Sequence, residues 1–221
     1  MRDYPFSFDS LNDFSKSLPY KNIPVEYLPL YMALKEQESS LNFPAIRDDI
    51  GIFINFIFTW LRPKNIFEFG SGYGQSAFWY LLKQDFVERI ILTEKRDDLV
   101  SVFDSMEWPS NWKSKLEYNQ GDAFETLKKS NISKFDFMLI DGVKADYLHF
   151  LEFSKDRLSK DGMILIDNSY WRGSFLDDEV SSKKLTAKKI KELHEFLSVS
   201  DEFESVFIPF EDGVTLIKKI K

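Results

Sequence analysis

Residues 67–76 read FEFGSGYGQS, an apolar stretch of strand type that runs into three glycines and then into helix-forming residues. Glycine lets the backbone adopt positive φ angles and pass close to a ligand, and the free N–H groups of a following helix can hold a carboxylate or a phosphate. The stretch therefore predicts a strand, a tight turn and a helix beside a small anionic or zwitterionic ligand. An ordinary turn without a ligand remains the alternative.

The spacing of the glycines separates two kinds of nucleotide site. A dinucleotide site uses G-x-G-x-x-G, whereas here Gly70, Gly72 and Gly74 alternate, Gln75 follows them and Glu68 precedes them. The pattern E-x-G-x-G-x-G favours S-adenosylmethionine over NAD.

A second acid lies at the distance that a nucleoside site requires. Glu94 follows the apolar segment 90–93, which has the length and composition of a strand. A carboxylate at the end of the second strand can accept hydrogen bonds from both ribose hydroxyls of a nucleoside that lies across the sheet edge. Taken alone, Glu94 could instead be an acid that the dipole of a helix N-terminus favours.

Strand-like and helical segments alternate outward from this motif. Strands are predicted at 66–69, 90–93, near 116, at 135–140 and at 163–166, with helices at 50–61, 77–82, 99–106, 122–129 and 144–158. A helix at 186–197 precedes two more strands, 203–209 and 214–220, joined by FEDG. We expect an α/β fold with a Rossmann-like seven-stranded sheet, mostly parallel, ending in an antiparallel hairpin and covered by helices on both faces. Such a sheet resembles that of the methyltransferases that use S-adenosylmethionine.

The predicted domain organisation is a helical arm or lid at residues 1–45, broken by prolines, and one catalytic domain at 46–221. No cysteine is present, which excludes disulfides and thiolate-bound metals. Neither a signal-like N-terminus nor a long enough apolar run occurs, so we expect a cytoplasmic protein without membrane contact. The net charge of −7 disfavours nucleic-acid binding, although lysines cluster between Lys183 and Lys191, most simply as the solvated face of a helix.

Oxygen side chains follow two more predicted strands. Asp141 comes directly after the apolar segment 137–140, and Asp167 and Asn168 come directly after 163–166. Because the carboxyl ends of parallel strands meet at one edge of a sheet, these side chains are expected to converge. Two carboxylates and an amide oxygen suit Mg²⁺. The alternative is that both aspartates cap the loops that follow them.

From Glu68 to the C-terminus the chain resembles the cation-dependent O-methyltransferases, the family of the catechol and caffeoyl-CoA O-methyltransferases and their bacterial relatives. The resemblance is carried by residues 68–79, 121–127, 135–147, 167–173 and 209–215, and residues 42–51 also look like the family's stretch before the catalytic core. Two departures concern the substrate pocket: Gln75 stands where members have Tyr or Arg, and Gly142-Val143 replace the commoner Ala-Asp.

The resemblance implies a role for each matching residue. The methionine and ribose parts of S-adenosylmethionine would lie among Glu68, Gly70, Ser71, Gly72, Ser76, Glu94 and Asp141, and the adenine would lie beside Asp122 and Ala123. Asp141, Asp167 and Asn168 would hold Mg²⁺, or Mn²⁺ or Ca²⁺ in its place, and Lys144 would be the general base. Trp171 would form a wall of the substrate pocket, or would be a core aromatic residue; His149 and His194 are expected to be packing or surface residues.

The resemblance further implies methyl transfer to a hydroxyl next to a second oxygen on a catechol-like small molecule, in a homodimeric enzyme. Three alternatives remain open. The substrate could be a hydroxyuridine in tRNA, with the lysines between Lys183 and Lys191 contacting phosphate. The protein could also be an NAD-dependent oxidoreductase, or a cofactor-binding protein without catalysis.

Overall fold

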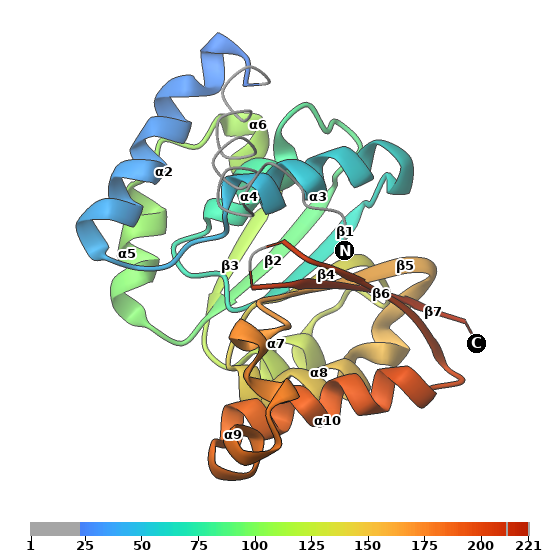
Figure 1. Ribbon diagram of the computed structural model, residues 1–221. Coiled ribbons are helices and arrows are strands. Elements are labelled where there is room, and N and C mark those ends of the chain that lie inside the picture. Colours follow the sequence, from blue (N-terminus) through green and yellow to red (C-terminus); the bar gives the residue numbers. More distant parts are fainter. Residues whose placement is uncertain (1–22, 211, 221) are drawn as a thin grey trace, which may run out of the picture.

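The computed structural model describes residues 23–210 and 212–220, and its centre is a seven-stranded sheet of order β3-β2-β1-β4-β5-β7-β6 (Figure 1). Strands β1 to β5 pair in parallel, and β7 runs antiparallel to both β5 and β6. The predicted parallel sheet with its terminal hairpin is therefore confirmed. The strands are β1 (Asn65–Phe69), β2 (Arg89–Glu94), β3 (Leu116–Gln120), β4 (Phe135–Ile140), β5 (Leu158–Asp167), β6 (Phe203–Ile208) and β7 (Val214–Lys219).

Helices lie on both sides of this sheet (Figure 1). One side carries α2 (Leu28–Leu41), α3 (Asp48–Leu61), α4 (Gln75–Leu81), α5 (Asp97–Ser105) and α6 (Ser110–Lys113). The other side carries α7 (Ala123–Lys129), α8 (Tyr147–Ser154), α9 (Asp178–Lys183) and α10 (Leu185–Val199). Short 3-10 turns complete the described chain: η2 (Val25–Tyr27), η3 (Lys144–Asp146), η4 (Lys155–Arg157) and η5 (Trp171–Leu176).

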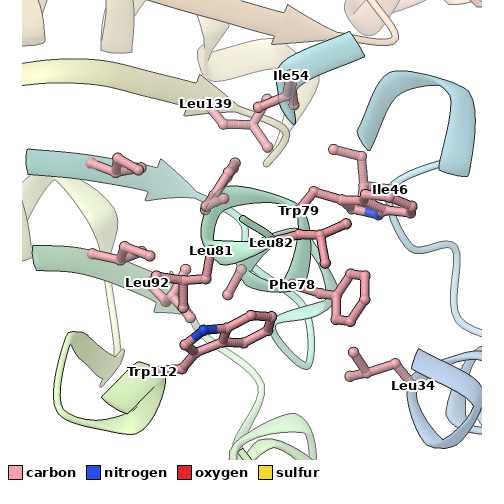
Figure 2. Close-up of a cluster of buried hydrophobic side chains, with 14 of the residues drawn as sticks. Leu34, Ile46, Ile54, Phe78, Trp79, Leu81, Leu82, Leu92, Trp112 and Leu139 are labelled. Atoms are coloured by element: carbon pink, nitrogen blue, oxygen red, sulfur yellow. The ribbon is translucent and has the colours of Figure 1, made fainter. Parts of the chain in front are cut away.

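Each central strand supplies two hydrophobic cores, because successive side chains point to opposite faces of the sheet. In β2, Ile90 and Leu92 pack with α3 and α4, whereas Ile91 packs with α7 and α8 on the other side. Figure 2 shows the first core, in which Leu92 and Leu139 from the sheet lie with residues such as Trp79. Burial on both faces explains why the strands read as continuous apolar runs.

Two predicted segments differ from the structure. The helix expected at 144–158 is split into η3, α8 and η4, because both of its ends form 3-10 turns. At the first end, Asp146 N–H donates to Val143 C=O, three residues back, at 2.8 Å. The strand expected at 163–166 begins five residues earlier, where Leu158 pairs with Phe135 across an irregular register. Residues 159–162 are polar and contain a glycine, so the sequence pattern there does not indicate a strand. Helices α6 and α9 were not predicted.

Residues 1–22 of the predicted arm lie outside the described residues, and the boundary at residue 45 stays a prediction. The described part of the arm is not detached from the domain, because α2 buries Leu30, Tyr31 and Leu34 in the core that it shares with α3 and α4. Among the described helices, none combines the length and the apolarity of a membrane span.

Candidate active site

A cavity of about 1030 Å³ opens at the carboxyl ends of β1, β2, β4 and β5. This is the edge at which parallel sheets bind their ligands. The predicted site residues that line it are Glu68, Gly70, Ser71, Gly72, Ser76, Glu94, Ala123, Asp141, Lys144, Asp167 and Asn168. Asp122 and Trp171 do not belong to this lining.

The glycine-rich turn after β1 requires glycine for two reasons. Gly70, Gly72 and Gly74 have φ angles of 87°, 53° and 83°, in the left-handed region that side chains disfavour. A Cβ atom on Gly70 would also come within 2.6 Å of the backbone oxygen of Asp141. The turn therefore packs directly against the end of β4, which brings the predicted cofactor loop beside the predicted metal ligand.

Glu94 is held by backbone donors on both sides. Its Oε2 accepts a hydrogen bond from Gly72 N–H at 3.2 Å, and its Oε1 accepts from Lys95 N–H at 2.8 Å and Arg96 N–H at 3.1 Å. One amide of the glycine-rich turn is thus already satisfied by a carboxylate. Such a turn is poorly suited to a phosphate, which needs those amides free.

Glu68 lies buried behind the turn, where Ser76 Oγ approaches its two carboxylate oxygens at 2.7 and 2.6 Å. Burial raises the pKa of Glu68 to about 8, and the hydrogen bond from Ser76 opposes this rise. In the ligand-free cavity the carboxyl is largely protonated at neutral pH. A cationic ligand would favour its ionised form.

Asp141 and Asp167 both face the cavity from the ends of adjacent strands. Burial raises the pKa of Asp141, and the ammonium group of Lys144, 3.4 Å from its Oδ1, opposes that rise. The pKa of Asp167 is raised to about 8 by burial and then by the charge of Asp141. Two buried carboxyls that repel each other in one cavity form an environment that a cation would stabilise.

Asn168 continues this acidic edge into a sharp turn. Its φ angle is 50°, a left-handed value that Asn tolerates better than most residues, and its N–H donates to Asp167 Oδ1 at 2.7 Å. The described residues contain no group of three or more His, Cys, Asp and Glu side chains suited to a metal. A cation here would therefore depend on two carboxylates and the Asn168 amide oxygen.

Lys144 stands at the start of η3, with its Nζ 5.6 Å from the ring centre of Tyr147 and 5.9 Å from that of Trp171. Tyr147 donates its hydroxyl to Asp167 C=O at 3.0 Å, which ties η3 and α8 to the end of β5. Trp171 is half-buried and packs against the core on the α8 side. The structure therefore brings Trp171 to Lys144 but leaves it outside the cavity lining.

Asp122 caps α7, since its Oδ1 accepts hydrogen bonds from Phe124 N–H at 2.9 Å and Glu125 N–H at 3.2 Å. Its Oδ2 lies 2.8 Å from Lys95 Nζ, and this hydrogen bond lowers the pKa of the carboxyl. Ala123, the first residue of α7, does line the cavity.

Sequence reasoning gave no role to residues 43–47 or to Arg172 and Asp212, all of which line the cavity. Three hydrogen bonds join the turn 168–173 to the connection between β6 and β7. Ser169 N–H donates to Gly213 C=O at 3.0 Å, and Tyr170 N–H donates to Asp212 C=O at 2.8 Å. Arg172 N–H donates to the Asp212 side chain. The only hint in the sequence was the segment FEDG at 210–213, which could be interpreted as a hairpin turn and nothing more.

The two histidines lie outside the cavity lining. His194 is half-buried against Phe175, its Nε2 lies 2.7 Å from Ser169 C=O, and burial lowers its pKa. The ring of His149 lies 4.7 Å from that of Phe124. Both contacts agree with packing roles.

Comparison with known proteins identifies the family. A family model described as O-methyltransferase matches residues 29–220. Caffeoyl-CoA O-methyltransferase 5 of Nicotiana tabacum is 24% identical over 190 residues, covering 81% of this chain and 78% of the relative; caffeoyl-CoA O-methyltransferase of Pinus taeda is 25% identical over 211 residues, covering 91% and 80%.

Solved structures share the fold. The O-methyltransferase from Bacillus cereus in complex with S-adenosylhomocysteine superposes with a TM-score of 0.79 at 18% identity, covering 95% of this chain and 97% of the other. The S-adenosylhomocysteine-bound methyltransferase PaMTH1 of Podospora anserina gives 0.78 at 21% identity and covers 100% of both chains. With a family model that spans most of its length and a matching sheet, this chain belongs to the O-methyltransferase family.

Proposed function

We propose that this protein transfers a methyl group from S-adenosylmethionine to a hydroxyl that has a second oxygen beside it, on a catechol-like small molecule, with the help of a divalent metal. One observation carries the proposal: Asp141, Lys144, Asp167 and Asn168 share a single cavity with the glycine-rich turn. Each part of the proposed reaction has its own support.

The charges of the cavity favour S-adenosylmethionine as the donor. That molecule carries a positive sulfonium and a positive ammonium group, and the cavity contains the carboxyls of Glu68, Glu94 and Asp141. The Gly72 amide is occupied by Glu94, which disfavours the pyrophosphate of NAD. Two relatives of the same fold, from Bacillus cereus and Podospora anserina, were solved with S-adenosylhomocysteine, the product of that donor.

The residues at the end of β4 and β5 fit a divalent cation by their chemistry. Asp141, Asp167 and Asn168 offer oxygen donors only, which Mg²⁺ and Mn²⁺ prefer, and burial raises the pKa of both carboxyls although the charge of Lys144 opposes the rise. When bound, the metal would stabilise the oxyanion form of the substrate hydroxyl.

Lys144 is proposed to receive the proton of that hydroxyl. Free phenols have a pKa near 10, so most arrive protonated at neutral pH and need a base. In the reaction the substrate oxygen forms a bond to the methyl carbon while the bond between that carbon and the sulfonium sulfur breaks. Lys144 enters this step as the neutral amine and not as the ammonium that pairs with Asp141, so that it can accept the hydroxyl proton. The products are the methyl ether, S-adenosylhomocysteine and the protonated Lys144.

The described residues support a small substrate over tRNA. Within the lysine-rich segment, Lys183 pairs with Glu179 at 2.5 Å, Lys189 with Glu192 at 2.7 Å and Lys191 with Asp178 at 2.6 Å. These ion pairs neutralise much of the charge that phosphate groups would need. The homodimer expected from the resemblance stays part of the proposal.

The test is a methylation assay with labelled S-adenosylmethionine and matched acceptors, one a vicinal diol and the other the corresponding monophenol. We expect turnover of the diol, its loss in excess chelator and its return with Mg²⁺ or Mn²⁺. Asp167→Ala should reproduce the chelator effect while binding S-adenosylhomocysteine normally. Full activity in chelator would contradict the metal assignment, and equal rates on both acceptors would contradict the requirement for a second oxygen.

A further inference from the structure

A short segment, residues 43–47, lies over the glycine-rich turn and lines the cavity with all five of its residues. We call it the roof segment. It follows Asn42, whose φ of 45° ends α2 in a left-handed residue, and it leads into α3 at Asp48. Its own backbone belongs to no helix or strand, and apart from the Arg47 C=O, which accepts from Gly51 N–H at 2.9 Å, the contacts described below involve side chains.

One end of the roof segment is held by ring contacts. The Phe43 ring lies so close to Gly72 that a Cβ atom on this glycine would be 2.6 Å from it. The same ring meets Tyr73 edge-on at 6.1 Å, and the guanidinium group of Arg96 lies 5.2 Å from its centre. Residues of the turn and of the connection between β2 and α5 thus support Phe43.

The other end of the roof segment is held by a buried amide. Gln75 Nε2 donates to Ile46 C=O at 3.2 Å, and Gln75 Oε1 accepts the hydroxyl of Tyr73 at 2.5 Å. That hydroxyl also lies 3.2 Å from Leu34 C=O on α2. The side chain of Ile46 lies in the core cluster with Trp79, as Figure 2 shows.

We propose that Gln75 is a positioning residue for the methyl donor: its amide fixes the roof segment over the cofactor end of the cavity, so that the donor is enclosed between the roof segment and the glycine-rich turn. This inference rests on the proposed function. Gln75 is 3% exposed and stands at the first position of α4. Its amide oxygen and one amide hydrogen are already engaged within the protein, which favours positioning over direct contact with the donor.

The first experiment tests, without any ligand, whether the hydrogen bond from Gln75 to Ile46 holds the roof segment in place. Hydrogen exchange should be faster at the roof segment in Gln75→Met, because methionine keeps the length of the side chain but cannot bond to Ile46. Gln84→Met is the matched control: Gln84 is also buried, its Nε2 donates to Asn55 C=O at 3.0 Å, and it does not line the cavity. Unchanged exchange at the roof segment in Gln75→Met would overturn the inference.

The second experiment measures S-adenosylhomocysteine affinity by calorimetry. Loss of the hydrogen bond to Ile46, together with the one from Tyr73, predicts binding about 10-fold weaker in Gln75→Met. Gln84→Met should bind within about twofold of the unmodified protein, even if its melting temperature falls as much. Binding by Gln75→Met within about twofold of the unmodified protein would refute the positioning role.

A double-mutant cycle with Phe43→Ala separates positioning from direct contact. If both side chains act through the roof segment, the double variant should bind about as weakly as the weaker single variant. If Gln75 instead contacts the donor directly, the losses measured for the two single variants should multiply in the double variant, which would overturn the inference. Failure of the unmodified protein to bind S-adenosylhomocysteine would instead overturn the proposed function on which the inference rests. The hydrogen-exchange result without ligand would still show whether Gln75 holds the roof segment in place.

Discussion

At the scale of single residues, the position of Lys144 decides what the cavity can do. Its Nζ lies 3.4 Å from Asp141 Oδ1, and the rings of Tyr147 and Trp171 flank it. A flexible lysine is therefore confined to the acidic end of the cavity. An amine held there can take a proton only from a substrate hydroxyl that is bound within hydrogen-bonding distance of it. Replacing Lys144 therefore tests whether the substrate binds in that place.

Lys144→Met should lower kcat by about 10²–10⁴, the usual contribution of a general base, with little change in S-adenosylhomocysteine affinity. Raising the pH should restore part of the rate, because more of the substrate hydroxyl ionises without a base. Lys155→Met is the control, since Lys155 pairs with Glu202 and does not line the cavity. A kcat at neutral pH equal to that of the unmodified protein would rule out the base assignment.

Glu94→Ala should weaken S-adenosylhomocysteine binding by roughly 2–3 kcal/mol, the scale for losing hydrogen bonds to a charged group. The carboxylate would no longer hold the ribose hydroxyls, and Gly72 N–H would lose its acceptor. Calorimetry measures the change, and Glu117→Ala serves as the control, since Glu117 is exposed on β3 and does not line the cavity. An affinity unchanged by Glu94→Ala would contradict the ribose assignment.

At the scale of secondary-structure elements, the acid at the start of α7 stabilises a helix whose first residue lines the cavity. Asp122 caps the helix through two backbone N–H groups, and the next residue, Ala123, lines the cavity. The capping bonds therefore place the first turn of α7 at the cavity wall.

Asp122→Ala should cost about 1 kcal/mol of the free energy of unfolding, the usual value for a lost cap, and lower the melting temperature by about 2–4 °C in a chain of this size. Asp122→Asn should recover most of the loss, since its amide oxygen can still accept both hydrogen bonds. Thermal unfolding checks both variants. If Asn and Ala destabilise the protein equally, the Lys95 ion pair and not the cap is the stabilising contact.

At the scale of the whole molecule, the sheet gathers acids from strands that are distant in sequence into one buried cavity. The pKa of Glu68 rises from 4.5 to about 8 and that of Asp167 from 3.8 to about 8, in each case chiefly through burial. Ligand-free protein therefore holds protons that the unfolded chain releases. At neutral pH these buried carboxyls destabilise the folded protein, and they favour cationic ligands.

The sign of the pH dependence follows from these shifts. Between about pH 4.5 and 8 the folded state binds more protons at Glu68 than the unfolded state does, so the free energy of unfolding falls as pH rises through that range, by up to about 1.4 kcal/mol per pH unit. Glu68→Gln should show a smaller decrease. Thermal unfolding of ligand-free protein at several pH values measures both slopes, and identical slopes would contradict the raised pKa.

The sequence by itself determined the order of the strands, the glycine-rich turn and the acids at the strand ends. Each of these depends on local chemistry: a short continuous apolar run marks a strand buried on both faces, positive φ favours glycine, and a polar residue after an apolar run marks the strand's end. Because parallel strands end at one edge, the order of the residues was enough to assign Glu94, Asp141 and Asp167 to one site.

Only the tertiary structure decided which side chains close that site. Gln75 was noticed as a departure, but its bond to Ile46 joins residues 29 positions apart, and Asp212 supports Arg172 across 40 positions. The early start of β5 likewise depends on the pairing of Leu158 with Phe135. Asp122 caps α7 and Trp171 packs against the core, and both lie outside the cavity lining. Such contacts leave no periodic signal in the chain, because they depend on how separate elements pack and not on the residues of any one element.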